Sequence, residues 1–142
     1  MDTDTTQETA ARLRRAVTRL HRRLRASALG GVSPAQASLL ASVERLESPS
    51  LGELALAEQV TPPTVTKAVQ SLEEAGLLTC SPDPDDRRST RVRLTPNGRR
   101  EVATIRRRKT EFLEGALRQL SPADRKRARD AVDFLETLVE GS

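Results

Sequence analysis

The chain has 142 residues, of which 24 are Lys or Arg and 20 are Asp or Glu, with one Cys and one His. This length fits a single domain, residues 1–142, and leaves no room for a separate catalytic domain. One Cys excludes an internal disulfide, and one Cys with one His gives no ligand set for zinc, so we expect no cofactor. No apolar stretch approaches the roughly 20 residues that span a bilayer, and no signal peptide is visible, so we expect a cytoplasmic protein without membrane contact.

The composition favours packed helices. Hydrophobic residues make up 36% of the chain, and the aromatic residues are two Phe. The core must therefore be built from Leu, Val and Ala, which suits helices better than a β-sandwich.

Five helix starts are marked by a Ser or Thr that can cap free backbone N–H groups. In four of them Pro follows, and its fixed φ suits the first helical position. The fifth, Ser50, has capping-box spacing to Glu53. The five residues are Ser33, Ser50, Thr61, Thr95 and Ser121. Ser48-Pro49 and Ser81-Pro82 are not followed by an apolar helical period and predict turns.

Apolar spacing then predicts the elements in chain order. An amphipathic helix over residues 6–29, ended by Gly30 and Gly31, precedes helices over 34–46 and 51–57. A helix over 62–75 ends before Gly76. Strands over 77–80 and 90–94 flank a charged, turn-rich loop, which predicts a hairpin with a long exposed tip. Helices over 96–120 and 122–140 complete the chain.

The two short helices over 51–57 and 62–75 have a helix-turn-helix pattern. The residues expected to face a common core are Leu51, Leu54, Ala55, Val60, Val65, Val69 and Leu72. The outer face of the second helix is small, polar or basic and has no carboxylate before Glu73, so it can approach DNA. The candidate DNA-binding residues of this face are Thr61, Pro62, Pro63, Thr64, Thr66, Lys67 and Gln70.

Such a helix places its N-terminal residues against base edges in the major groove. Gln70 can bond adenine, and Lys67 can reach guanine or phosphate. A plain surface helix is the alternative for the same residues.

Three stretches of the sequence resemble the multiple antibiotic resistance regulator (MarR) family of winged helix-turn-helix regulators. They are VTPPTVTKAV at 60–69, LEEAGLL at 72–78 and DPDDRRSTRVRLTPNG at 83–98. The resemblance is strongest over the central third, and the number and order of the flanking helices extend it over nearly the whole chain. It implies a mainly α fold with a small β-hairpin wing. Residues 33–95 would form the winged helix-turn-helix DNA-binding lobe, and 6–29 with 96–140 a dimerisation lobe.

The family's Asp-x-Arg and Leu-Thr elements fall on Asp86, Arg88, Leu94 and Thr95. The resemblance implies that Arg88 enters the minor groove from the wing, 77–94, while Asp86 holds the wing through an ion pair. An Arg fits a narrow minor groove, whose negative potential is enhanced. The other wing arginines are expected to contact phosphates, which adds affinity and salt dependence but little sequence choice. They are Arg87, Arg91 and Arg93.

The basic residues are concentrated between positions 87 and 109, where Glu101 is the one acidic residue. A local positive field of this kind favours a polyanion. Charge alone fits a solvated surface equally well, so the helix-turn-helix and wing motifs decide between the two.

The first and last helices have more apolar positions than one small winged domain needs, which predicts a homodimer. A two-fold dimer would place its recognition helices roughly 34 Å apart on an inverted-repeat operator in double-stranded DNA. Arginines of the first helix could meet an acidic stripe of the last helix across the dimer, although each stripe could also be solvated. The stripe comprises Asp130, Asp133, Glu136 and Glu140.

The resemblance further implies a ligand-responsive repressor whose effector is a small, often phenolic anion between the dimer helices and the DNA-binding lobe. Helices 6–29, 34–46 and 96–120 would line that site, but no polar cluster in the sequence marks it. We therefore predict no ligand residues. His21 is expected on the surface, and Cys80 is expected to be inert, although Arg87 and Arg88 nearby would favour a lowered thiol pKa.

Three other functions fit parts of the pattern. An architectural protein would bind DNA with little sequence preference. A protein-binding winged-helix module would have a less basic wing and a more apolar recognition face. An enzyme would need a nucleophile–base pair, a phosphate loop or a metal set, and the sequence has none of these.

Overall fold

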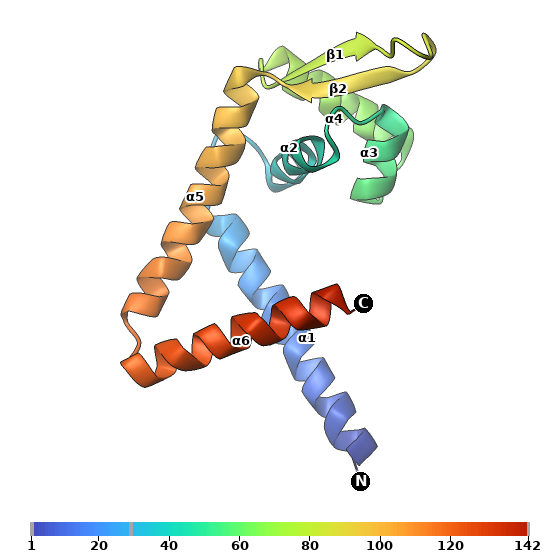
Figure 1. Cartoon of the computed structure of the whole chain (residues 1–142). Helices are drawn as coiled ribbons and strands as arrows, with labels where there is room; N and C mark the ends of the chain where they lie inside the picture. Colours follow the sequence, from blue (N-terminus) through green and yellow to red (C-terminus); the bar gives the residue numbers. More distant parts are fainter. Residues whose placement is uncertain (1, 29, 142) are drawn as a thin grey trace.

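The structure, a computed structural model, describes residues 2–28 and 30–141, with side chains from residue 5 onward. Within these residues it has six helices and one antiparallel two-stranded hairpin, so the predicted mainly α fold with a hairpin wing is confirmed (Figure 1). The helices are α1 (Asp2–Ser27), α2 (Pro34–Leu46), α3 (Leu51–Glu58), α4 (Pro62–Glu74), α5 (Pro96–Arg118) and α6 (Pro122–Glu140), and the strands are β1 (Leu78–Pro82) and β2 (Thr90–Leu94).

The predicted caps begin their helices. The side chains of four caps each accept a backbone N–H from the first turn, and Ser33 forms a full capping box with Gln36. These four are Ser33, Ser50, Thr95 and Ser121. Thr61 precedes α4 as predicted but makes no cap bond, because its hydroxyl lies 2.8 Å from that of Thr64.

Some boundaries differ from those predicted. Helix α1 begins at Asp2 rather than at residue 6, and its predicted end at residue 29 lies outside the described residues. Ser81-Pro82, predicted as a turn, instead pairs with Arg91 and Thr90 as the end of β1. Proline is tolerated there because β1 is an edge strand whose outer side needs no N–H donor. The turn follows at Asp83, whose N–H donates to the carbonyl of Ser89.

The core lies between α2, α3, α4 and the hairpin, and Val102 of α5 closes it. Leu40, Leu54, Leu72 and Val92 are fully buried. The predicted inward residues of the helix-turn-helix are buried or packed against this core, with one exception. Val60 is 40% exposed, because it follows the end of α3 and lines a cavity instead.

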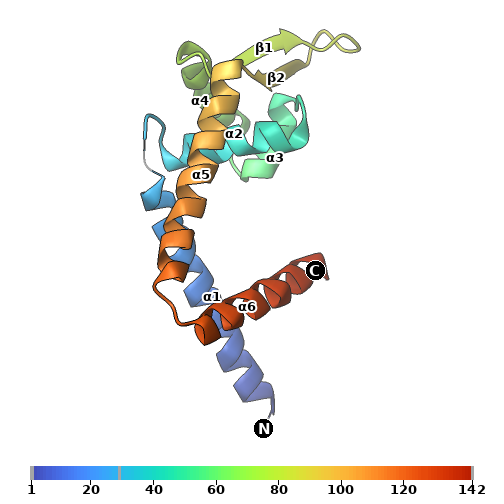
Figure 2. The same ribbon diagram turned by 60° about the vertical axis from the view of Figure 1, so that its left-hand side comes forward.

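Helix α5 runs from the wing to α6 and contacts the C-terminal part of α1, and the two helices then diverge. Helix α6 crosses α1 in the half of the molecule away from the wing (Figures 1 and 2). No residue of α6 is buried. Side chains of α1 and α6 border a shared apolar groove that includes Leu13, Val17, Phe134 and Leu138. None of the described helices combines the length and hydropathy that a membrane span requires.

Candidate nucleic-acid interface

Helix α4 presents the face that the sequence predicts. Val65, Val69 and Leu72 are buried against the core, which turns the opposite side of the helix to solvent. Thr66 is half-buried, and the other predicted residues of this face are exposed. These are Thr61, Pro62, Pro63, Thr64, Lys67 and Gln70.

The beginning of α4 is free of negative charge. Its first turn contains no acidic residue, and Thr61 does not cap it. The N-terminal end of a helix has a partial positive charge. A phosphate approaching this end would therefore meet no opposing carboxylate within the turn.

The wing extends away from the core as a hairpin with Leu78 opposite Leu94 and Pro82 opposite Thr90 (Figure 1). Its loop is closed by two backbone bonds of 2.9 Å, from Asp83 N–H to Ser89 and from Ser89 N–H to Asp86. Arg87 at the tip is exposed, as is Arg93 on β2.

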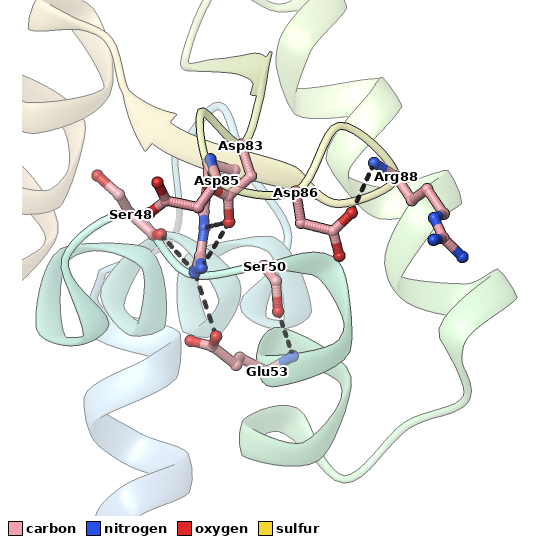
Figure 3. A network of polar contacts seen from close by, with 8 residues as sticks. Ser48, Ser50, Glu53, Asp83, Asp85, Asp86 and Arg88 are labelled. Carbon is pink, nitrogen blue, oxygen red and sulfur yellow. Dashed lines mark hydrogen bonds and ion pairs between the residues drawn. The ribbon is translucent and has the colours of Figure 1, made fainter.

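The side chain of Arg88 is exposed and points away from the loop (Figure 3). The carboxylate of Asp86 accepts the backbone N–H of Arg88 at 3.1 Å. Asp86 therefore shapes the backbone of the tip, and the ion pairs described in the wing join Arg91 to Asp83 and Glu53. The resemblance assigned the ion pair that holds the wing to Asp86. In the structure, Arg91 forms these ion pairs with Asp83 and Glu53.

Arg91 differs from the other wing arginines. Its Nε and Nη2 lie 2.9 and 2.8 Å from Oδ2 of Asp83. Its Nη1 lies 3.2 Å from Oε1 of Glu53 and 3.4 Å from the carbonyl of Ser48 (Figure 3). The backbone N–H of Asp85, and then Arg91, hold the pKa of Asp83 below its usual value. Both members of this pair are therefore charged at neutral pH.

The base of the wing is tied to α5. The Thr95 hydroxyl donates to the carbonyl of Gly76 at 2.6 Å and accepts the N–H of Gly98 at 3.0 Å. The N–H of Thr95 donates to Leu77. A side chain at Gly98 would place its Cβ 2.1 Å from the carbonyl oxygen of Leu77. This junction therefore requires glycine at position 98.

A cavity of about 520 Å³ lies between α1, α2, α4 and α5. Thr64, Val65 and Ala68 of α4 form part of its wall, so α4 borders the cavity directly. His21 is exposed, as predicted, and also lines this space. The other charged lining residues are Arg25, Glu58, Arg106 and Lys109.

No local pattern in the sequence marks this cavity, because its lining residues come from separate segments. Helices 6–29, 34–46 and 96–120 were expected to contribute, and the structure adds α4 and Glu58. The Glu58 carboxylate accepts the hydroxyls of Ser38 at 2.9 Å and Ser42 at 3.0 Å. Arg106 forms an ion pair with Glu44.

Cys80 is half-buried at the wing. Burial raises the pKa of its thiol, and the carboxylate of Glu73 raises it further. A raised pKa keeps the thiol protonated at neutral pH, and the thiolate is the reactive form. This agrees with the expected inert residue and not with a thiol pKa lowered by Arg87 and Arg88.

The chain is similar to several known proteins that are described as transcriptional regulators. The model of the MarR family matches residues 32–90. An uncharacterized HTH-type transcriptional regulator of Mycobacterium bovis is 33% identical over 140 residues, which cover 98% of each chain.

Among solved structures, a protein of Pseudomonas aeruginosa assigned as a transcriptional regulator is similar with a TM-score of 0.85 and 30% identity over 96% of each chain. MepR of Staphylococcus aureus, solved as a mutant bound to an oligodeoxyribonucleotide, has a TM-score of 0.71 at 19% identity, with 92% of this chain and 97% of that chain covered. At that identity the likeness to MepR shows the shared fold.

Proposed function

The chain belongs to the MarR family of HTH-type transcriptional regulators, and we propose that it is a sequence-specific repressor that binds an inverted-repeat operator as a homodimer. Membership makes it a DNA-binding transcriptional regulator and not an enzyme. A cytoplasmic location, expected from the sequence, is part of the proposal because its DNA partner is there.

The observation that carries the proposal is the joint exposure of two surfaces, the outer face of α4 and the basic wing tip. In the proposed complex, α4 lies in the major groove and the wing reaches the minor groove. Gln70 and Lys67 contact base edges, and Arg88 enters the minor groove. Arg87 and Arg93 contact phosphates, which makes binding dependent on salt.

The apolar faces of α1 and α6 support the homodimer. Phe134 is 58% exposed, and Val17, Leu20 and Val132 are also exposed in the single chain. Contiguous exposed apolar surface of this kind marks an interface. A second copy packed on these faces would place the two α4 helices about one DNA turn, roughly 34 Å, apart.

The cavity beside α4 supports control by a small anionic effector, such as a phenolic acid. Apolar side chains from α2, α4 and α5 would surround the ring, while Arg25 and Lys109 would attract its carboxylate. Release of DNA requires that the ligand bind the DNA-free arrangement of α4 more tightly than the DNA-bound one. A ligand against Thr64 and Ala68 contacts the element that would have to move.

Two variants of the purified chain test the proposal on DNA selected from a random pool by the wild type. Gln70→Ala is expected to cost about 1–3 kcal/mol of specific binding and to change base preference at one position of each half-site. Arg88→Ala is expected to weaken binding. It should also make the negative slope of log affinity against log salt less steep by about 0.9 for each half-site. Gln119→Ala and Arg118→Ala, exposed on the far end of α5, are the matched controls.

The alternatives predict other outcomes of this experiment. An architectural protein would bind selected and scrambled DNA with equal affinity. A protein-binding winged-helix module would bind neither at low salt, and the exposure of Arg87 and Arg88 argues against it.

A further inference from the structure

We infer that Arg91 is a positioning residue rather than a phosphate contact, and that with Asp83 and Glu53 it holds the wing at a fixed angle to the helix-turn-helix. Together, Arg91, Asp83 and Glu53 form the wing anchor. The inference rests on the proposed role of the wing in binding DNA. It reassigns one residue that the sequence placed among the phosphate contacts.

The geometry of the guanidinium carries the inference. Every nitrogen of the group has an acceptor: Nε and Nη2 face Oδ2 of Asp83, and Nη1 faces both Glu53 and the carbonyl of Ser48. The side chain of Asp83 is only 8% exposed, and that of Arg91 is 32% exposed. A phosphate could bind Arg91 only by displacing these partners.

The charges point the same way. Two carboxylates surround the single positive charge of Arg91. Their field would repel a phosphate at this point, in contrast to Arg93, which is exposed two residues along the same strand. The anchor therefore contributes to DNA binding through geometry and not through its net charge.

The anchor joins segments that are distant in the sequence. Glu53 lies in the first turn of α3, where its N–H is held by Ser50, and Ser48 lies in the connection between α2 and α3. The N–H of Val92 donates to the carbonyl of Pro49 at 2.9 Å, which attaches β2 to the same connection. The wing is thus fastened to the helix-turn-helix at its side as well as to α5 at its base.

Asp83 connects the anchor to the tip. Its Oδ2 accepts from Arg91, while its Oδ1 accepts the N–H of Asp85 at 2.9 Å in the loop that presents Arg88 (Figure 3). One carboxylate therefore orders the loop and fastens it. Loss of Arg91 should loosen both the angle of the hairpin and the conformation of its tip.

Nuclear magnetic resonance of the free protein tests the anchor without DNA. In the wild type we expect backbone order parameters near 0.85 for residues 84–89, the range of a rigid backbone. Arg91→Gln and Glu53→Gln should lower them toward about 0.6, while α2 to α4 stay unchanged. Arg93→Gln is the matched control and should leave the loop ordered. Unchanged order parameters in both anchor variants would overturn the inference.

Binding to the selected DNA tests the consequence. Glu53→Gln removes a negative charge, which ordinarily strengthens binding to a polyanion. If Glu53 acts through the anchor, the variant should instead bind roughly 3- to 10-fold more weakly. Asp85→Asn is the matched control, because it removes a carboxylate from the wing loop without changing an acceptor of Arg91. This variant should bind equally well or more tightly. Equal or tighter binding by Glu53→Gln would contradict the anchor and return Arg91 to the phosphate contacts.

Footprinting separates positioning from general destabilisation. Both anchor variants should lose protection of the minor groove from hydroxyl radicals at the wing and keep protection of guanine N7 in the major groove at α4. Loss of both protections would show a damaged fold and reject the positioning role. Failure of the proposed function has a separate signature, because the wild type would then select no DNA while the order parameters would still decide whether the anchor exists.

Discussion

At the scale of single residues, Gly98 is the clearest case of one residue type that the geometry at the base of the wing requires. It lies in the first turn of α5, where Thr95 caps the helix and also bonds Gly76 at the end of α4. The close approach of the Leu77 carbonyl leaves no room for a Cβ. The Leu-Thr motif and Gly98 therefore form one junction, which joins α4, the wing and α5.

We expect Gly98→Ala to destabilise the protein by about 1–3 kcal/mol, because the clash is with backbone and cannot be relieved by a rotamer change. Urea unfolding at fixed protein concentration measures the effect. Gly115→Ala is the control within the same helix, since a Cβ there meets nothing within 4 Å. It should be neutral or stabilising by up to about 1 kcal/mol, the difference in helix propensity. Equal stability of the two variants would refute the tight junction.

At the scale of elements, the cavity is bordered by helices of two kinds. α1 and α5 carry its cationic residues, while α4 carries the surface proposed to read DNA. The hydroxyls of Ser38 and Ser42 hold Glu58 at the end of α3, so α2 and α3 are also coupled beside the cavity. A ligand in this cavity would contact α4 at Thr64 and Ala68 without touching DNA.

We expect monocyclic aromatic acids to release the selected DNA, and the corresponding neutral amides to have little effect. Arg25→Gln and Lys109→Gln should weaken the response to the acid roughly 3- to 10-fold, since each removes a charge that would pair with a carboxylate. Arg25 is exposed and Lys109 is half-buried. DNA affinity without ligand should be nearly unchanged. Fluorescence anisotropy of labelled DNA measures both quantities, and Arg129→Gln on α6 is the control. An equal response to acids and amides would contradict an anionic effector.

At the scale of the whole molecule, apolar side chains are distributed unequally. The core around α2, α3, α4 and the hairpin is closed, but α6 has no buried residue in a single chain. The groove between α1 and α6 is apolar and open. A surface of this composition is what a second copy of the chain would cover.

We expect Phe134→Glu to convert the dimer into a monomer at micromolar concentration. The two-fold axis would place the substitution twice in one interface, and each lost Phe contributes about 1.5–3 kcal/mol of burial. Analytical ultracentrifugation measures the state. Leu56→Glu is the control, because Leu56 on α3 is 82% exposed yet lies outside the α1 and α6 faces. A dimer that survives Phe134→Glu, or one lost equally in Leu56→Glu, would argue against this interface.

The sequence alone determined the elements and the exposed face of α4 that is proposed to contact DNA. Ser33, Ser50, Thr95 and Ser121 cap the helices they were predicted to cap, and the apolar period of α4 correctly separated Val65, Val69 and Leu72 from the exposed Gln70. These features depend on interactions within a few residues, such as caps and helical periodicity, which a sequence displays directly.

Only the tertiary structure decided which side chains meet across elements. From the sequence, Arg91 and Arg93 had the same predicted role as phosphate contacts. In the folded chain, Glu53 and Asp83 form ion pairs with Arg91. Val60, which was predicted to face the core, lines the cavity instead. Burial and the carboxylate of Glu73 raise the pKa of the Cys80 thiol, although arginines lie nearby in the sequence. Such partners are set by how helices and strands pack in three dimensions, and distance along the chain does not encode them.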